Sequence, residues 1–234
     1  NVAVTESLDY IATELEKLTK GGKSIQAAAL ELLPKLVKEN KRILFNGNGY
    51  SAEWAKEAAK RGLLNLKNTV DALGSLIHPE NIALFEKYKV LNEREVHSRY
   101  DIMVETYNKT INIEAQLMVL MANRYILPSA LEYQKQVAQS VAAVKAAGAK
   151  SVEGKKLLGT VVKLVDSFKK DTEKLQKALD HTSNDALKHA KHFRDGVIPA
   201  MVALRKTGDA LEAIVPHGVW ALPTYREMLF VSKA

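Results

Sequence analysis

The sequence predicts an all-α fold. Apolar residues recur at alternating steps of three and four along almost every segment, and no stretch shows the sustained alternation at period two that marks a half-buried strand. Hydrophobic residues make 47% of the 234-residue chain and charged residues 26%, which is a globular balance rather than a disordered one. A chain of this length can bury a substantial core, as one large unit or two small ones.

The first two predicted helices are separated by a glycine pair. An apolar stripe defines the first helix: Val4, Leu8, Ile11, Leu15 and Leu18. Gly21 and Gly22 are expected to end it, because glycine adopts the left-handed backbone of a helix C-terminus at little cost. Ser24 is expected to cap a second helix that runs to about Leu44, with Pro34 kinking or splitting it.

Shorter helices follow, each marked by turn or capping residues. A turn cluster at residues 46–49 precedes a helix that Ser51 caps and that ends near Gly62. Two further short helices are expected to begin at Thr69 and at His78, the second with proline at its first position.

A long helix is expected from Asn92 to about Tyr125. Asn92 and Glu95, three residues apart, form a capping arrangement at its start. Pro128 is expected to break or bend it, since proline lacks the backbone N–H of a helix interior.

From Pro128 onward the sequence predicts a hairpin-like helical bundle. One helix ends at about Ala147, a longer one runs from Ser151 to about His181, and a third runs from Asp185 to Lys206. Two coiled-coil seams support it, Leu158, Val161, Val165, Phe168, Thr172, Leu175 and Leu179 on one helix, and Ala186, Ala190, Phe193, Val197, Ala200 and Leu204 on the next. Their connecting turn is short, so antiparallel neighbours are expected.

Two breaker-rich places interrupt this pattern. Pro199 predicts a bend near Ile198. Residues 215–223 contain too many helix breakers for a helix but are too apolar for a free end, so we expect this tail to pack back onto the body.

Composition excludes several function classes. The chain has no cysteine, which rules out a disulfide scaffold, a zinc finger, an iron–sulfur site and a thiol nucleophile and fits a cytoplasmic location. No apolar run is long enough to cross a bilayer, so no membrane partner is expected. The net charge of +7 alternates with acidic residues along helix faces and aromatics make only 6%, so no nucleic-acid partner is expected.

Three polar constellations each leave two interpretations open. The glycine-rich stretch at residues 45–51 is favoured as a capped turn over a phosphate site, because it lacks the dinucleotide and P-loop patterns. His181, His189 and His192 are favoured as the lining of an exposed helix end over a metal site. His97 is favoured as part of a buried polar network over a general acid or base. We therefore predict no catalytic, cofactor-binding or metal-ligating residue.

Several motifs resemble the C-terminal region of type III glutamine synthetases. They cover nearly the whole chain in order, at residues 5–11, 44–54, 61–66, 83–88, 95–100, 109–115, 126–131 and 220–227. They include Phe45-Asn46-Gly47-Asn48-Gly49-Tyr50-Ser51, Glu95-Val96-His97-Ser98-Arg99-Tyr100 and Trp220-Ala221-Leu222-Pro223.

The resemblance implies a parent enzyme that makes glutamine from glutamate, ammonia and ATP with Mg²⁺ or Mn²⁺, assembled as stacked double hexameric rings. The family's active-site residues would lie before Asn1, so this region is expected to be inactive alone and to bind no cofactor. Because the chain begins without Met, we also expect it to be a trimmed piece of a longer one.

The implied organisation has three parts. Residues 1–127 would be the helical C-terminal part of the catalytic domain, residues 128–214 a helical hairpin or bundle extension, and residues 215–234 a tail packed back on the body. The expected partners are the remainder of the same catalytic domain and further copies of the chain. The alternative is a free-standing helical module whose seams dock a partner helix.

Overall fold

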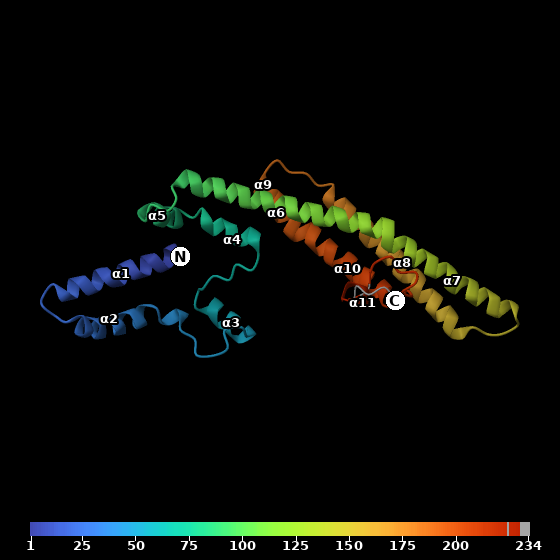
Figure 1. Ribbon diagram of the computed structural model, residues 1–234, viewed down its shortest axis with the longest axis horizontal. Helices are drawn as coiled ribbons and strands as arrows, with labels where there is room; N and C mark the ends of the chain where they lie inside the picture. Colours follow the sequence, from blue (N-terminus) through green and yellow to red (C-terminus); the bar gives the residue numbers. More distant parts are fainter. Residues whose placement is uncertain (224, 230–234) are drawn as a thin grey trace. The chain divides into compact units, whose positions relative to one another are not determined.

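The computed structural model describes residues 1–223 and 225–229, and helices make up most of this part of the chain (Figure 1). No β-strand occurs among the described residues, so the predicted all-α class is confirmed. The chain divides into two compact units, which we call unit 1 (residues 1–103) and unit 2 (residues 104 onward). The division falls within a long helix and differs from the expected boundary after residue 127, which stays a prediction about the parent enzyme.

Unit 1 contains five whole helices and the start of a sixth. They are α1 (Val2–Thr19), α2 (Ile25–Glu39), α3 (Ala52–Lys60), α4 (Thr69–Leu76), α5 (Pro79–Lys87) and the first residues of α6 (Glu93–Met121), with a 3₁₀ turn at Lys41–Ile43 after α2. Helix α1 packs on α2 and on α5. Asp9 of α1 accepts a hydrogen bond from the Tyr88 hydroxyl over 2.7 Å and lies 3.3 Å from Lys87 Nζ.

The predicted caps of unit 1 are confirmed. Ser24 Oγ accepts the Ala27 N–H over 3.3 Å at the start of α2, and Ser51 does the same for α3. At α6 the capping is reciprocal: the Glu95 N–H donates to Asn92 Oδ1 over 3.0 Å, and the Asn92 N–H donates to Glu95 Oε2 over 2.9 Å. Each cap satisfies amide groups that have no partner inside the first helical turn.

Helix α2 is shorter than predicted and is not split. It continues through Pro34 as one element and ends at Glu39 rather than near Leu44. Asn40 ends the helix, because both its backbone N–H and its side-chain Nδ2 donate to the Leu36 carbonyl oxygen. The missing proline N–H removes one hydrogen bond, and the neighbouring turns keep the helix continuous.

Unit 2 is a bundle of long helices. Its elements are the remainder of α6, α7 (Leu127–Ala146), α8 (Val152–Leu179), α9 (Ala186–His192), α10 (Ile198–Glu212) and α11 (Tyr225–Leu229). Helix α8 packs along both α7 and α10, and short connections join these neighbours, so they run antiparallel as predicted (Figure 1). Gly148 makes the turn between α7 and α8 with a φ of +79°, a conformation that favours glycine.

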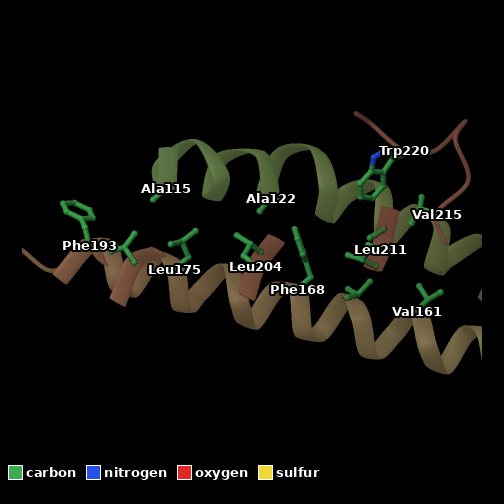
Figure 2. Close-up of a cluster of buried hydrophobic side chains, with 13 residues drawn as sticks. Ala115, Ala122, Val161, Phe168, Leu175, Phe193, Leu204, Leu211, Val215 and Trp220 are labelled. Carbon is green, nitrogen blue, oxygen red and sulfur yellow. The ribbon is translucent and has the colours of Figure 1, made fainter. Parts of the chain in front are cut away.

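The first predicted seam forms the centre of unit 2. Val161, Val165, Phe168, Thr172 and Leu175 are all buried on α8, and the outermost seam residues are half-buried. Figure 2 draws Val161, Phe168 and Leu175 among the side chains of the core. Thr172 satisfies its hydroxyl by donating to the Phe168 carbonyl oxygen over 2.8 Å. The threonine therefore stays in the apolar seam without an unpaired polar group.

The second seam is longer than predicted. Its buried members on α9, α10 and the segment between them include Ala190, Phe193, Val197 and Leu204, and only Ala186 at its start is exposed. Beyond Leu204 the same spacing continues through Gly208, Leu211 and Val215, all of them buried. The seam thus extends through the end of α10 and into the tail.

The tail packs onto unit 2 as predicted over its described residues. Trp220 is only 9% exposed and belongs to the same core cluster as Val215 (Figure 2). Val219 and Leu222 pack against this cluster. Residues 224 and 230–234 lie outside the described residues, so the prediction for the end of the tail is not tested there.

Neither Pro128 nor Pro199 breaks its helix, and a π-helical segment precedes each of them. A five-residue π-helical segment, Ala122–Ile126 or Phe193–Val197, ends two residues before each proline. Leu127, just before Pro128, donates its N–H to the Ala122 carbonyl oxygen five residues back, and Ile198, just before Pro199, donates to that of Phe193. This wider turn rearranges the hydrogen bonding around the position where the proline ring lacks a donor, so the helical path continues.

Candidate functional site

One side of α2 presents an uncovered apolar surface. Leu30, Leu33 and Val37 follow one another at steps of three and four and are 72%, 52% and 53% exposed. We call these three residues the α2 outer face. A different side of the same helix carries the buried Ala28 and Leu32.

Helix α2 is therefore apolar on two sides, and a surface helix has only one apolar stripe. Covering the three side chains of the α2 outer face would stabilise an assembly by a few kcal/mol, at ~25 cal/mol per Å² of apolar surface. This face has the character of a contact surface.

Helix α1 is also incompletely covered. No residue of α1 is buried, although it carries the predicted apolar stripe. Val4 and Leu8 at its start are 61% and 62% exposed, and the rest of the stripe is only half-buried. The two helices that open unit 1 thus both leave apolar area exposed.

The glycine-rich stretch forms a capped turn, as predicted. Ser51 Oγ donates to the Asn48 carbonyl oxygen over 2.8 Å and accepts the Trp54 N–H, while the Tyr50 N–H donates to Asn48 Oδ1 over 3.0 Å. These side chains occupy the backbone donors that a phosphate would use. The Phe45 ring stacks on Trp54 with the ring centroids 4.5 Å apart.

Arg61 ties this turn to the end of α3. Its guanidinium lies 5.5 Å from the centre of the Trp54 ring and donates to the carbonyl oxygens of Arg42 and Leu44. Glu57 accepts from Arg61 Nε over 2.8 Å, and this hydrogen bond holds the pKa of the Glu57 carboxyl below its usual value. Arg61 thus links the end of α3 to the turn beside the stacked Phe45–Trp54 pair, which is a structural role.

The three histidines near the α8–α9 connection come together. The ring centroids of His181 and His192 are 4.2 Å apart, those of His181 and His189 are 6.4 Å apart, and His189 stacks on Phe193. His192 Nε2 lies 2.8 Å from the Ala178 carbonyl oxygen. Burial, followed by the charges of the other two histidines, lowers the pKa of His189.

This histidine group offers no metal centre. In the described part of the chain, no three or more His, Cys, Asp or Glu side chains are placed so that they could hold a metal ion. His181 is exposed and the other two histidines are half-buried, which fits the favoured interpretation of a helix-end lining. The divalent ion implied for the parent enzyme therefore finds no donor set among these residues, and no catalytic step through it is assigned to them.

His97 differs from its predicted role. It is exposed on α6, so the predicted buried network around it is wrong. The buried positions of this segment are Val96 and Tyr100, which take the side of the helix that the charged neighbours of His97 leave free.

None of the helices in the described residues has the length and apolar character needed to span a membrane.

The described residues thus form a helical domain whose opening helices leave apolar surface exposed. The family described as glutamine synthetase C-terminal domain matches residues 28–145, half of the chain, and the chain belongs to this family.

The whole length of the chain is also similar to curated glutamine synthetases. It is 33% identical to a glutamine synthetase of Butyrivibrio fibrisolvens over 94% of this chain and 32% of the relative. It is 33% identical to the type-3 glutamine synthetase of Dictyostelium discoideum over 99% of this chain and 32% of the relative. A glutamine synthetase of Bacteroides fragilis is 28% identical over 98% of the chain. The chain thus spans about a third of the length of these relatives, and the predicted resemblance is confirmed.

Sequence reasoning missed the α2 outer face, although the signal is present. Leu30, Leu33 and Val37 repeat at helical spacing beside the second apolar set of Ala28 and Leu32. A helix with two apolar sides predicts burial in a larger assembly. The expectation that Pro34 splits this segment hid that pattern.

Proposed function

We propose that this chain is the helical structural and assembly region of a type III glutamine synthetase. In this proposal the complete enzyme makes glutamine from glutamate, ammonia and ATP, and this region supplies no reacting group. The α2 outer face is the observation that carries the proposal. It is an exposed apolar surface on a chain that spans about a third of the length of its relatives.

Unit 1 is the part that meets the rest of the enzyme. Its α2 outer face and the start of α1 would pack against the remainder of the same catalytic domain, whose surface supplies the missing apolar contacts. Unit 2 encloses its own core and would project as a self-supporting bundle. The two roles differ because the apolar stripes of unit 2 are buried within the unit, whereas those of unit 1 are left partly exposed.

The remaining features of the parent enzyme are part of the same proposal. ATP and Mg²⁺ or Mn²⁺ would bind to the parent's catalytic residues outside this chain, the assembly would be stacked double hexameric rings, and the location would be the cytoplasm. Family membership supports oligomeric assembly in general.

A substitution on the α2 outer face tests the proposal. Leu30→Asp in the complete enzyme should weaken assembly and lower glutamine formation, because the aspartate would be buried without a partner. The same substitution in the 234-residue chain should change stability by no more than ~0.5 kcal/mol, since the side chain is exposed there. Mass photometry and a glutamine-formation assay give the readouts.

Ala27→Asp is the matched control. It adds the same charge to the same helix at an exposed position close to the Ser24 cap, where a carboxylate is favoured by the helix dipole. The enzyme carrying it should assemble normally. If Leu30→Asp assembles as well as Ala27→Asp, the α2 outer face is a solvent surface and the proposal fails.

A second test addresses the absence of chemistry in this region. Calorimetric titration of the 234-residue chain with ATP and Mg²⁺ should show no binding in the micromolar range. Micromolar binding would contradict the assignment of the nucleotide site to the rest of the enzyme.

A further inference from the structure

An open groove lies in unit 2 at the place where α8 ends. Its walls come from the second half of α6, from the π-helical segment Ala122–Ile126 and from the last turn of α8. Two of its lining residues, Val119 and Leu179, also pack against the core of unit 2, so the groove is fixed to the body of the bundle. The rest of its lining is largely polar and includes one cation and one anion.

Arg124 supplies the cation. It is the middle residue of the π-helical segment and its side chain is exposed. Among residues 1–223 and 225–229, its guanidinium has neither an ion-pair partner nor a hydrogen-bond acceptor. A guanidinium whose donors are all free fits a carboxylate through two parallel hydrogen bonds. Short π-helical segments are also found often at binding sites, because the wide turn changes the direction of its side chains.

Asp180 supplies the anion, at a position where the helix disfavours it. The residue is the C-cap of α8, where the helix dipole is negative and the last carbonyl oxygens have no partners within the helix. Gln176 Nε2 donates to Asp180 Oδ1 over 3.1 Å, but no cationic side chain of the described ranges pairs with this carboxylate. A positive group placed beside the end of α8 would be attracted both by the carboxylate and by the dipole.

The two charges line the same groove and yet do not neutralise each other. Arg124 and Asp180 form no ion pair, so each remains available to a bound molecule. A simple anion would be repelled by Asp180 and a simple cation by Arg124. A molecule that carries a carboxylate and an ammonium group on one carbon satisfies both side chains, and this is the structure of an α-amino acid.

Three amide side chains restrict the class further. Gln116, Asn123 and Gln176 line the groove, and each donates its side-chain NH₂ group to a neighbour on its own helix, over 3.3, 3.0 and 3.1 Å. Their carbonyl oxygens are left as acceptors, and an acceptor is best matched by an N–H donor of the ligand. An amide at the end of the ligand's own side chain supplies such a donor without adding charge.

We propose that this groove binds a zwitterionic α-amino acid that has an amide side chain. The carboxylate of the ligand accepts hydrogen bonds from Arg124, its ammonium group lies at the end of α8 beside Asp180, and its side-chain amide donates to the carbonyl oxygens of the three amide residues. The site lies within unit 2 and does not depend on the role proposed for unit 1, so either proposal can fail without the other.

L-Glutamine has this chemistry and is the probe. Titrated into the isotope-labelled 234-residue chain, it should move the backbone amide resonances of residues 116–124 and 176–180 saturably, with a dissociation constant on the order of 1 mM for so small a ligand. The resonances of unit 1 should stay in place. N-Acetyl-L-glutamine lacks the ammonium group and the α-amide of L-glutamine lacks the carboxylate, so each should bind about tenfold more weakly.

Two variants test the charges of the groove. Arg124→Gln and Asp180→Asn should each weaken binding of L-glutamine about tenfold, because each removes one charge-assisted contact. Both side chains are exposed, so neither variant should lower the melting temperature, and Asp180→Asn also removes a negative charge from a helix C-terminus. The matched controls are Arg205→Gln and Asp166→Asn, which make the same changes at exposed positions outside the groove and should leave binding unchanged.

Three results would each overturn the proposal. The first is the lack of a saturable shift of the groove resonances with L-glutamine at millimolar concentration. The second is binding of the acetylated or amidated analogue to the wild-type chain as tightly as L-glutamine. The third is binding of L-glutamine to the Arg124 and Asp180 variants as tightly as to their controls.

Discussion

Units 1 and 2 are built from helices with the same spacing of apolar residues, yet only in unit 2 do these residues pack against one another in a large core. In unit 2 the stripes of α8 and α10 face each other and enclose a connected core from Ala115 to Trp220. In unit 1 the buried apolar residues are few: Ala28, Leu32, Val70, Val96 and Tyr100. Helices α1, α3 and α5 have no buried residue at all.

The difference separates helix formation from core formation. Caps and spacing produce helices in both units, because these are local properties of the sequence. Stability comes mainly from apolar area removed from water, which unit 2 achieves within the chain and unit 1 does not. We therefore expect the two units to respond very differently to the same kind of perturbation.

Separating the two halves should give the largest difference. A chain of residues 92–229, which keeps the α6 cap, should unfold in a cooperative thermal transition, because it retains the whole core of unit 2. A chain of residues 1–103, the whole of unit 1, should lose its helical signal gradually, because it has few buried apolar residues. Far-UV circular dichroism during heating measures both, and a sharp transition in the 1–103 chain would contradict the contrast between the units.

A charge in the seam of unit 2 should cost several kcal/mol. Phe168 is 1% exposed at the centre of the core, so Phe168→Asp would bury an unpaired carboxylate at a cost close to the whole stability of ~5–15 kcal/mol. Val152→Asp adds the same charge at the exposed start of α8 and should have little effect. Urea unfolding followed by circular dichroism compares them, and equal midpoints would show that the seam is not the core.

Loss of the α6 cap should have a smaller and local effect. Asn92→Ala removes the acceptor for the Glu95 N–H and should destabilise the first turn by about 1 kcal/mol. The amide of Val96, which bonds to the Asn92 carbonyl oxygen, should then exchange with solvent about fivefold faster. Glu95→Gln keeps an acceptor oxygen for the Asn92 N–H and should change the exchange rate less.

The smallest predicted effect is a pH dependence in unit 2. Burial is the main reason that the pKa of His189 is lowered, so the unfolded chain takes up this proton at a higher pH than the folded one. The contribution to stability is fully present above the unfolded pKa, about 6.5, and is lost as the pH falls through that value and on through the lower folded value. Melting temperatures measured across this range should therefore decrease toward acid.

His189→Gln should reduce this loss on acidification, whereas His97→Gln, at an exposed position of unit 1, should leave it unchanged. The charges of His181 and His192 contribute to the lowering of the His189 pKa, after burial. If His189→Gln lost stability toward acid as steeply as the wild-type chain, the role assigned to His189 would be wrong.

The seams show how much of unit 2 could be predicted. Every inner position of the α8 seam is buried, because a repeat of alternating three and four residues places side chains on one face of a helix wherever the helix lies. The tail was predictable from its apolar content, and Trp220 joins the core. These features depend on local periodicity and on the cost of exposing apolar surface.

The prolines and His97 show what local patterns cannot supply. The prolines predict a break or a bend at Pro128 and a bend near Ile198. In the structure a π-helical segment before each proline adjusts the hydrogen bonding, and neither helix is broken. Whether His97 is buried or exposed depends on which side of α6 is covered by other helices, and the spacing of apolar residues alone does not determine that side. A pocket in unit 2, lined among others by Met118, Phe168, Gly208 and Trp220, likewise arises from segments distant in sequence.

The π-helical segment at Ala122–Ile126 also sets the phase of everything that follows it. Four of the buried residues along this helix, Ala115, Ala122, Ala130 and Val137, are spaced by seven, eight and seven residues, and the longer interval spans this segment. Deleting a single residue there would shorten the long interval to seven and replace the wide turn by ordinary α-helix, so Ala130 and Val137 would keep their side of α7. A residue inserted in the regular part of α7 before Val137 has no such turn to absorb it and would rotate the following helix by roughly 100° about its axis, at 3.6 residues per turn. The π-helical segment is therefore the place where this long helix tolerates a change in length of one residue.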